Sequence, residues 1–101
     1  LVSSIHDSEN LLYNAIDFAK NMVKNSAPVS IALTRQMLWR SLEGSGPYDA
    51  HIVESKAIDS RGASKDAKEG VSSFLEKRAS EFKNQVSSDM PEFFPWWKDT
   101  N

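Results

Sequence analysis

The sequence predicts an all-α domain, a small bundle of about four helices with an extended aromatic tail at its C-terminal end. Apolar residues recur at three- and four-residue steps through most of the first 80 positions, which is the helical period. Proline and glycine interrupt this period at Pro28, at 44–47 and at Gly62, where one helix would end and the next begin. A length of 101 residues fits one domain, residues 1–101.

The first predicted helix runs from Ser8 to about Lys24. Asp7 stands before it as an N-cap, because its carboxylate can accept the free amide hydrogens of the first turn. One side of this helix carries its regularly spaced apolar residues: Leu12, Ala15, Ile16, Ala19, Met22 and Val23. We therefore expect an amphipathic helix with one buried face.

The second predicted helix begins at Pro28 and runs to about Glu43. Proline suits a first turn, where its missing amide hydrogen costs nothing. Apolar residues cover more than one face: Val29, Ile31, Ala32, Leu33, Met37, Leu38, Trp39 and Leu42. Such a helix is usually covered on two sides, and in so small a chain we expect one covering surface to come from outside it.

The third predicted helix spans about Tyr48 to Ser60, with Gly62 as a left-handed terminator. We expect four of its residues to face inward: Ala50, Val53, Ala57 and Ile58.

The fourth predicted helix begins after Ser64, a good N-cap, and is expected to reach Phe82 or Lys83. Gly70 lies inside it, at a cost of about 1 kcal/mol relative to alanine. A cost of this kind suggests the close approach of another backbone.

The tail, VSSDMPEFFPWWKDTN, has neither a helical nor a strand period, and Pro91 and Pro95 argue against regular structure. It holds four aromatic residues within five positions: Phe93, Phe94, Trp96 and Trp97. Bare rings of this density favour aggregation, so we expect them to pack on their own domain or on a neighbouring subunit. A membrane-surface contact and a disordered end are the other readings.

Composition excludes several classes of function. A net charge of -2 and a pI of about 5.6 lack the basic excess of nucleic-acid-binding domains. The chain has no cysteine, which excludes disulfides and thiolate metal sites and fits a reducing compartment, so we expect a cytoplasmic protein. No signal peptide and no apolar run of transmembrane length is visible, and we expect no membrane partner. The start, LVSSI, resembles the end of a strand begun upstream, which suggests a piece of something longer.

The residue types of a catalytic or metal site are not arranged as one. His6 and His51 lie far apart and lack partners at metal-ligand spacing, and no glutamates form an evident acid/base pair. We therefore assign no catalytic residue, no metal and no cofactor. Phe74 and Lys77, three residues apart in EGVSSFLEKR, have two readings. They are a core residue beside a solvated lysine, or they hold a ligand with a flat ring and phosphates.

In the ligand reading, the ring packs on Phe74 and the Lys77 ammonium meets a phosphate. Arg78 and Lys83 would raise the local positive potential.

Four segments resemble the C-terminal helical region of the enoyl-CoA hydratase/isomerase family, the crotonase superfamily. They are LVSSIHDSENLLYNAIDFAKNMV, SAPVSIALTRQML, SKDAKEGVSSFLEKRASEF and MPEFFPWW, in the family's order and spacing. EGVSSFLEKR is the most specific of them. The departures are small: Arg35 replaces a common lysine, Ser73 a common alanine, and 79–80 a pair that often contains proline.

The resemblance implies that catalysis takes place in an upstream core that this chain lacks, on an oxyanion hole of backbone amides and one or two glutamates. The parent enzyme would hydrate 2-enoyl-CoA thioesters in fatty-acid degradation, with acyl-CoA as substrate and no separate cofactor. The helical region would close over the active site and build a trimer, or a hexamer of stacked trimers. Phe74 and Lys77 match family residues that approach the adenine and phosphates of CoA.

Two alternatives remain. The parent could be an enoyl-CoA isomerase or another enzyme acting on CoA thioesters. The chain could also be a non-catalytic helical interaction module. A peripheral membrane binder that uses the aromatic tail is a third, weaker reading.

Overall fold

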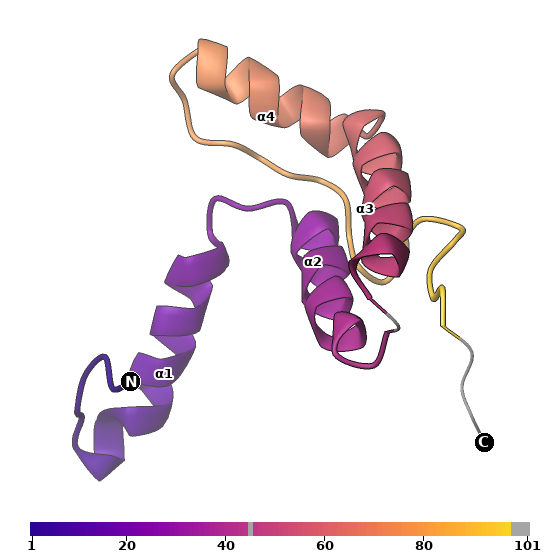
Figure 1. The fold of residues 1–101 in the computed structure, drawn as a ribbon. Coiled ribbons are helices and arrows are strands. Elements are labelled where there is room, and N and C mark those ends of the chain that lie inside the picture. The colour runs from indigo at the N-terminus through magenta and orange to yellow at the C-terminus, as the bar shows by residue number, and fades with distance from the viewer. Residues whose placement is uncertain (45, 98–101) are drawn as a thin grey trace.

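The structure, a computed structural model, describes residues 1–44 and 46–97. Its four helices follow one another along the chain (Figure 1): α1 Ser8–Val23, α2 Pro28–Ser41, α3 Pro47–Gly62 and α4 Lys65–Leu75. No strand occurs within this described part, and residues 1–7 are irregular. The all-α prediction with an aromatic tail is confirmed, and each helix begins within a residue of its predicted start.

The core is small and lies between α2, α3 and the tail. Three apolar residues are buried in it: Val29, Leu33 and Ala57. Partly buried residues pack around them: Met37, Met90, Phe93, Phe94 and Trp96. The rings of Phe94 and Trp96 meet edge to face with centroids 6.0 Å apart. Packing of the aromatic tail on its own domain is thus confirmed for the described rings.

Helix α1 points away from the other helices and contributes nothing to this core (Figure 1). The prediction of a buried face is wrong for this chain: none of its residues is buried, and Leu12 is 73% exposed. Its sequence is amphipathic as expected, but no described segment of the chain lies over the apolar side.

Helix α2 has two apolar sides, of which one faces the core through Val29 and Leu33. The other side leaves Leu38, Trp39 and Leu42 exposed. That a surface from outside the chain covers this second side stays a prediction.

Helix α3 departs from its predicted inward set. Ala57 is buried and Val53 half-buried, but Ala50 and Ile58 are exposed. The helix contacts α2 on one side and α4 near its end, so only a narrow stripe of it is covered. Gly62 is the last helical residue of α3. The prediction that it ends the helix in a left-handed conformation is wrong, because its φ is not positive.

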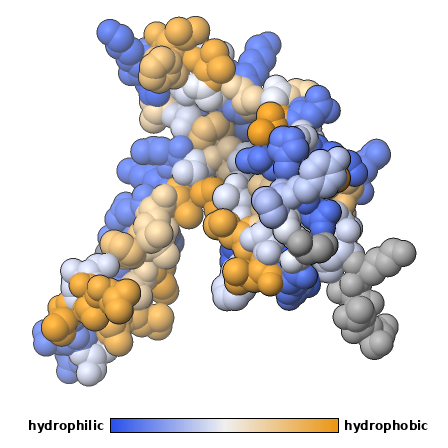
Figure 2. All heavy atoms as spheres, viewed as in Figure 1, coloured by the Kyte–Doolittle hydropathy of each residue, from blue (hydrophilic) through white to orange (hydrophobic). Residues whose placement is uncertain are grey.

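Much of the chain's apolar surface is therefore uncovered, as Figure 2 shows along α1 and around α4. The accessible surface is 8535 Å², whereas a compact monomer of this mass exposes about 5,700 Å². The radius of gyration is 16.8 Å, against about 13 Å for a compact domain of this length. Within the described residues, no helix has the length and apolar character needed to cross a membrane.

Candidate functional site at the end of α4

Helix α4 presents an apolar side to solvent. The Ser64 hydroxyl caps its start by accepting the Ala67 N–H at 3.1 Å, as predicted. Near the other end, Val71, Phe74 and Leu75 are exposed, and Phe74 retains 82% of its accessible surface. Phe74 is therefore not a core residue in this chain, which contradicts the reading of Phe74 and Lys77 as a core residue beside a solvated lysine.

Lys77 lies beyond the helix, in a left-handed turn with φ of 55°. The Lys77 N–H donates to the Phe74 carbonyl oxygen at 3.3 Å, and the Arg78 N–H donates to that of Ser73 at 3.0 Å. This pair of bonds is a Schellman motif, in which glycine usually takes the left-handed position. The prediction that this helix reaches Phe82 or Lys83 is wrong: α4 ends at Leu75, so Lys77 lies outside the helix that carries Phe74.

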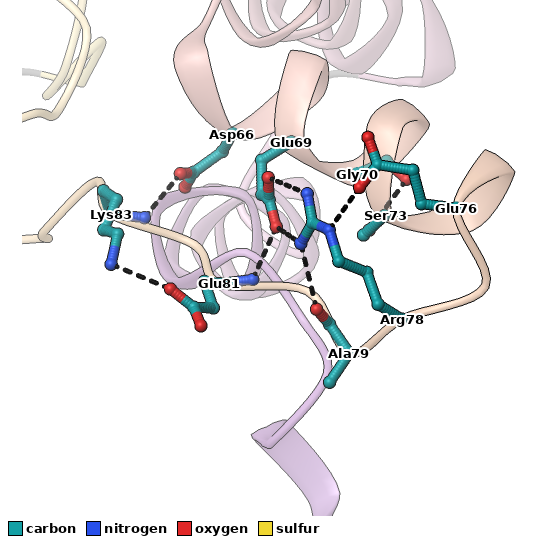
Figure 3. Close-up of polar contacts among 9 residues, drawn as sticks. All are labelled: Asp66, Glu69, Gly70, Ser73, Glu76, Arg78, Ala79, Glu81 and Lys83. Atoms are coloured by element: carbon teal, nitrogen blue, oxygen red, sulfur yellow. Dashed lines mark hydrogen bonds and ion pairs between the residues drawn. The ribbon is translucent and has the colours of Figure 1, made fainter.

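The turn is held by a cluster that we call the Glu69–Arg78 clamp (Figure 3). Arg78 donates to both carboxylate oxygens of Glu69, at 2.6 and 2.9 Å. It also donates to the Glu76 carboxylate at 2.6 Å and the Ala79 carbonyl oxygen at 3.1 Å. The backbone N–H of Glu81 completes the clamp by donating to Glu69 at 2.8 Å. The clamp thus joins α4 to the chain that follows it.

These bonds fix the charges of the clamp. Hydrogen bonds from the Arg78 guanidinium and the Glu81 N–H lower the pKa of Glu69 from 4.5 to about 2. The two carboxylates beside it raise the pKa of Arg78 above its ordinary value. Arg78 is therefore already matched by Glu69 and Glu76, and Lys83 pairs with Glu81 at 3.2 Å.

Lys77 differs from these two cations. Its ammonium has no hydrogen bond or ion pair with any residue in the described part of the chain. The expectation that Arg78 and Lys83 raise the local positive potential does not hold, because both are paired, whereas Lys77, three residues after Phe74, is not.

After the turn, the chain returns along α4 (Figure 1). Asp66 is buried, with 3% of its surface exposed, and its Oδ1 accepts the N–H groups of Lys83 and Asn84 at 2.9 and 3.1 Å. The ring of Phe82 lies over Gly70, 3.7 Å from where a Cβ would stand. The prediction that another backbone approaches Gly70 is therefore wrong for the described residues, since its close neighbour is the Phe82 ring.

Asp66, Glu69 and Arg78 were not singled out as a group from the sequence. Glu69 is one of the glutamates among which the sequence shows no evident acid/base pair. No periodic signal joins it to Arg78, because the two residues stand nine positions apart on either side of a helix end. The signals that the sequence does contain are the acidic residues of α4 and the run EKR. Their pairing becomes visible only once the turn after α4 is known.

The other candidate groups remain apart. His6 bonds with Ser4 and Asn14, and His51 lies 3.8 Å from Glu54 on the surface. Among residues 1–44 and 46–97, no three side chains of metal-ligating type come together.

Comparison with known proteins gives a consistent result. No family model matches the chain. It is 35% identical over 83 residues to Enoyl-CoA hydratase ACTT3 of Alternaria alternata, and equally to Enoyl-CoA hydratases AFT3-1 and AKT3-2 of that organism. The match takes in 82% of this chain but only 27% of each relative's length. The chain is thus similar to a minor part of proteins named enoyl-CoA hydratase, as a fragment of such a protein would be.

Proposed function

We propose that this chain is the C-terminal helical part of an enoyl-CoA hydratase-like enzyme of the crotonase family. In that role it contributes assembly and closure of the CoA site, while residues outside the chain hydrate the 2-enoyl-CoA thioester. The similarity to three hydratases and the resemblance of EGVSSFLEKR to the family's segment support this proposal.

The observation that carries the assembly role is the uncovered surface. The chain exposes roughly 2,800 Å² more than a compact monomer of its mass, and obligate interfaces bury about 2,000–5,000 Å² counted over both partners. Much of it is apolar, on α1, on the outer side of α2 and on α4. An apolar groove of about 390 Å³ runs along the outer side of α2, between Ile31, Leu38 and Trp39. The proposed partners are further copies of the chain, as a trimer or hexamer, and the rest of the enzyme.

The CoA contact is assigned to Phe74 and Lys77. An exposed ring offers an apolar platform for a nucleobase, and an unmatched ammonium offers a point charge for a phosphate. Lys77 also occupies a left-handed position at a cost of about 1 kcal/mol or more, which glycine would avoid. A lysine kept at such a cost favours a role for its side chain.

Calorimetric titration of CoA into the purified protein tests this assignment. Lys77→Gln removes the ammonium at similar size, and we expect about tenfold weaker binding for the loss of one charged contact. Phe74→Ala should weaken binding as well. Lys20→Gln, which makes the same charge change on the remote helix α1, is the control and should bind as the unaltered protein does. Absence of CoA binding, or equal affinity of Lys77→Gln and the control, would contradict the assignment.

A second candidate function, a non-catalytic helical interaction module, is favoured by one observation. The described residues expose large apolar faces on α1, on the outer side of α2 and on α4, as a module that binds other proteins would. Self-association without any CoA binding would favour this module. Isomerisation, or another reaction of CoA thioesters, is distinguished from hydration by an assay of the enzyme with crotonyl-CoA.

A further inference from the structure

We infer that Glu69 and Arg78 are positioning residues for the CoA contact, which hold the turn that presents Lys77 beside Phe74. This inference rests on the proposed function and adds two residues to it that do not touch CoA.

The geometry of the clamp supports a positioning role. Arg78 makes a two-pronged contact with Glu69 and a third contact with Glu76, so its guanidinium is fixed from two sides (Figure 3). Isolated surface ion pairs contribute little, but bidentate pairs within a network are the exception. Both residues that flank Lys77 in sequence, Glu76 and Arg78, are held in this network. The strained backbone of Lys77 is thus fixed on either side.

The clamp lines a groove that the residues of the proposed contact do not share. Glu69, Glu76, Arg78 and Glu81 line a polar groove of about 550 Å³ between α4 and the returning chain. Neither Phe74 nor Lys77 is among the residues that line this groove. The clamp therefore holds the turn through residues that line a groove without Phe74 and Lys77, as residues that position a ligand contact without making it would.

Charge makes a sharp test possible. Glu69→Gln removes a negative charge near the site, so electrostatics alone predicts tighter binding of an anion such as CoA. A positioning role predicts the opposite, because the amide cannot accept both prongs of Arg78. Glu81→Gln is the matched control: it removes the same charge nearby, and only the backbone of Glu81 belongs to the clamp.

The experiment measures the affinity for CoA by calorimetry in a double-mutant cycle. We expect Glu69→Gln to bind CoA about threefold or more weakly, and Glu81→Gln to bind as well as the unaltered protein or slightly better. In the Lys77→Gln background, Glu69→Gln should have no further effect, since it acts through Lys77. A loss that came from general destabilisation would add to that of Lys77→Gln.

Arg78→Lys provides a second variant should Glu69→Gln fail to fold. It keeps the charge but lacks the planar fork, so electrostatics predicts no change and positioning predicts weaker binding. Unchanged or tighter binding by the folded variants, or additive losses in the cycle, would overturn the inference. If Lys77→Gln weakens binding while Glu69→Gln does not, only this inference fails. If CoA does not bind at all, the proposed function fails with it.

Discussion

Lys77 is a lysine at a position that the backbone would give to glycine. Its φ of 55° places Cβ near the following carbonyl oxygen, at a cost of about 1–2 kcal/mol. We predict that Lys77→Gly raises the free energy of unfolding by about 0.5–1 kcal/mol, because added freedom of the unfolded chain offsets part of the relief. Chemical denaturation measures this gain. Lys77→Ala keeps the Cβ and should gain nothing; an equal gain would assign the effect to the side chain.

Glu69 gives the clamp a pH dependence whose sign follows from its lowered pKa. Since the folded pKa is about 2 and the ordinary value 4.5, the ionised form stabilises the fold above pH 4.5. That contribution is lost as the pH falls from about 4.5 to about 2. We predict that stability falls less over this window in Glu69→Gln than in the unaltered protein. Denaturation at several pH values measures the difference, with Glu9→Gln on α1 as a control that should follow the unaltered protein.

Asp66 illustrates a buried carboxylate with a structural task. Its Oδ1 accepts two backbone N–H groups of the returning chain, which would otherwise lose this acceptor. We predict that Asp66→Ala lowers the free energy of unfolding by about 2–4 kcal/mol, the cost of two unsatisfied donors. Asp59→Ala, an exposed change on α3, should cost much less. Equal losses in the two variants would show that the backbone N–H groups find other partners.

Among the elements, α4 shows where prediction from sequence stops. Local signals placed the starts of all four helices within a residue, because Pro28, Pro47 and Ser64 act within a single turn. The predicted capping of α1 by the Asp7 carboxylate was wrong, since Asp7 precedes the helix but its side chain makes no capping hydrogen bond. The end of α4 was placed about seven residues too late, since residues 76–83 contain no proline or glycine. Glu69 and Asp66 take the N–H groups that a longer helix would need, and such a contact between distant residues leaves no local signal.

Gly70 allows the helix propensity of α4 to be tested in the isolated chain, apart from any contact that an assembly would add. In this chain a Cβ at position 70 would make an ordinary contact with Phe82, so alanine fits. We predict that Gly70→Ala raises the stability of the monomer by up to about 1 kcal/mol through helix propensity. Thermal unfolding at low concentration tests this. A loss of stability would contradict the contact with Phe82 as the structure gives it.

The candidate site was predictable only in part, because contacts between residues distant in sequence leave no local signal. Phe74 and Lys77 were named from a single run of sequence, whereas their supports were not, because Asp66 and Glu69 act across a turn. The burial of apolar faces was also misjudged. Periodicity identifies which side of α1 is apolar, but it carries no information on whether the covering surface belongs to the same chain.

At the scale of the whole molecule, uncovered surface is the dominant feature. Among the described residues only three apolar ones are buried, while the apolar sides of α1 and α4 and the outer side of α2 face solvent. A core of this size offers little against the entropy of ordering a chain of 101 residues. We therefore expect the helices to reach full stability only when a partner covers them, so that stability and association rise together with concentration.

The last prediction concerns that association. Leu12 lies on the apolar side of α1, and Asn21 lies about 180° around the helix on its polar side. We predict that Leu12→Gln shifts the sedimentation profile toward monomer at a fixed concentration, because the covered face loses an apolar side chain. Asn21→Gln introduces the same residue on the opposite side and should leave the profile unchanged. Equal shifts in both variants would point to a loss of helix, and no shift in either would place the interface of this chain on α2 or α4.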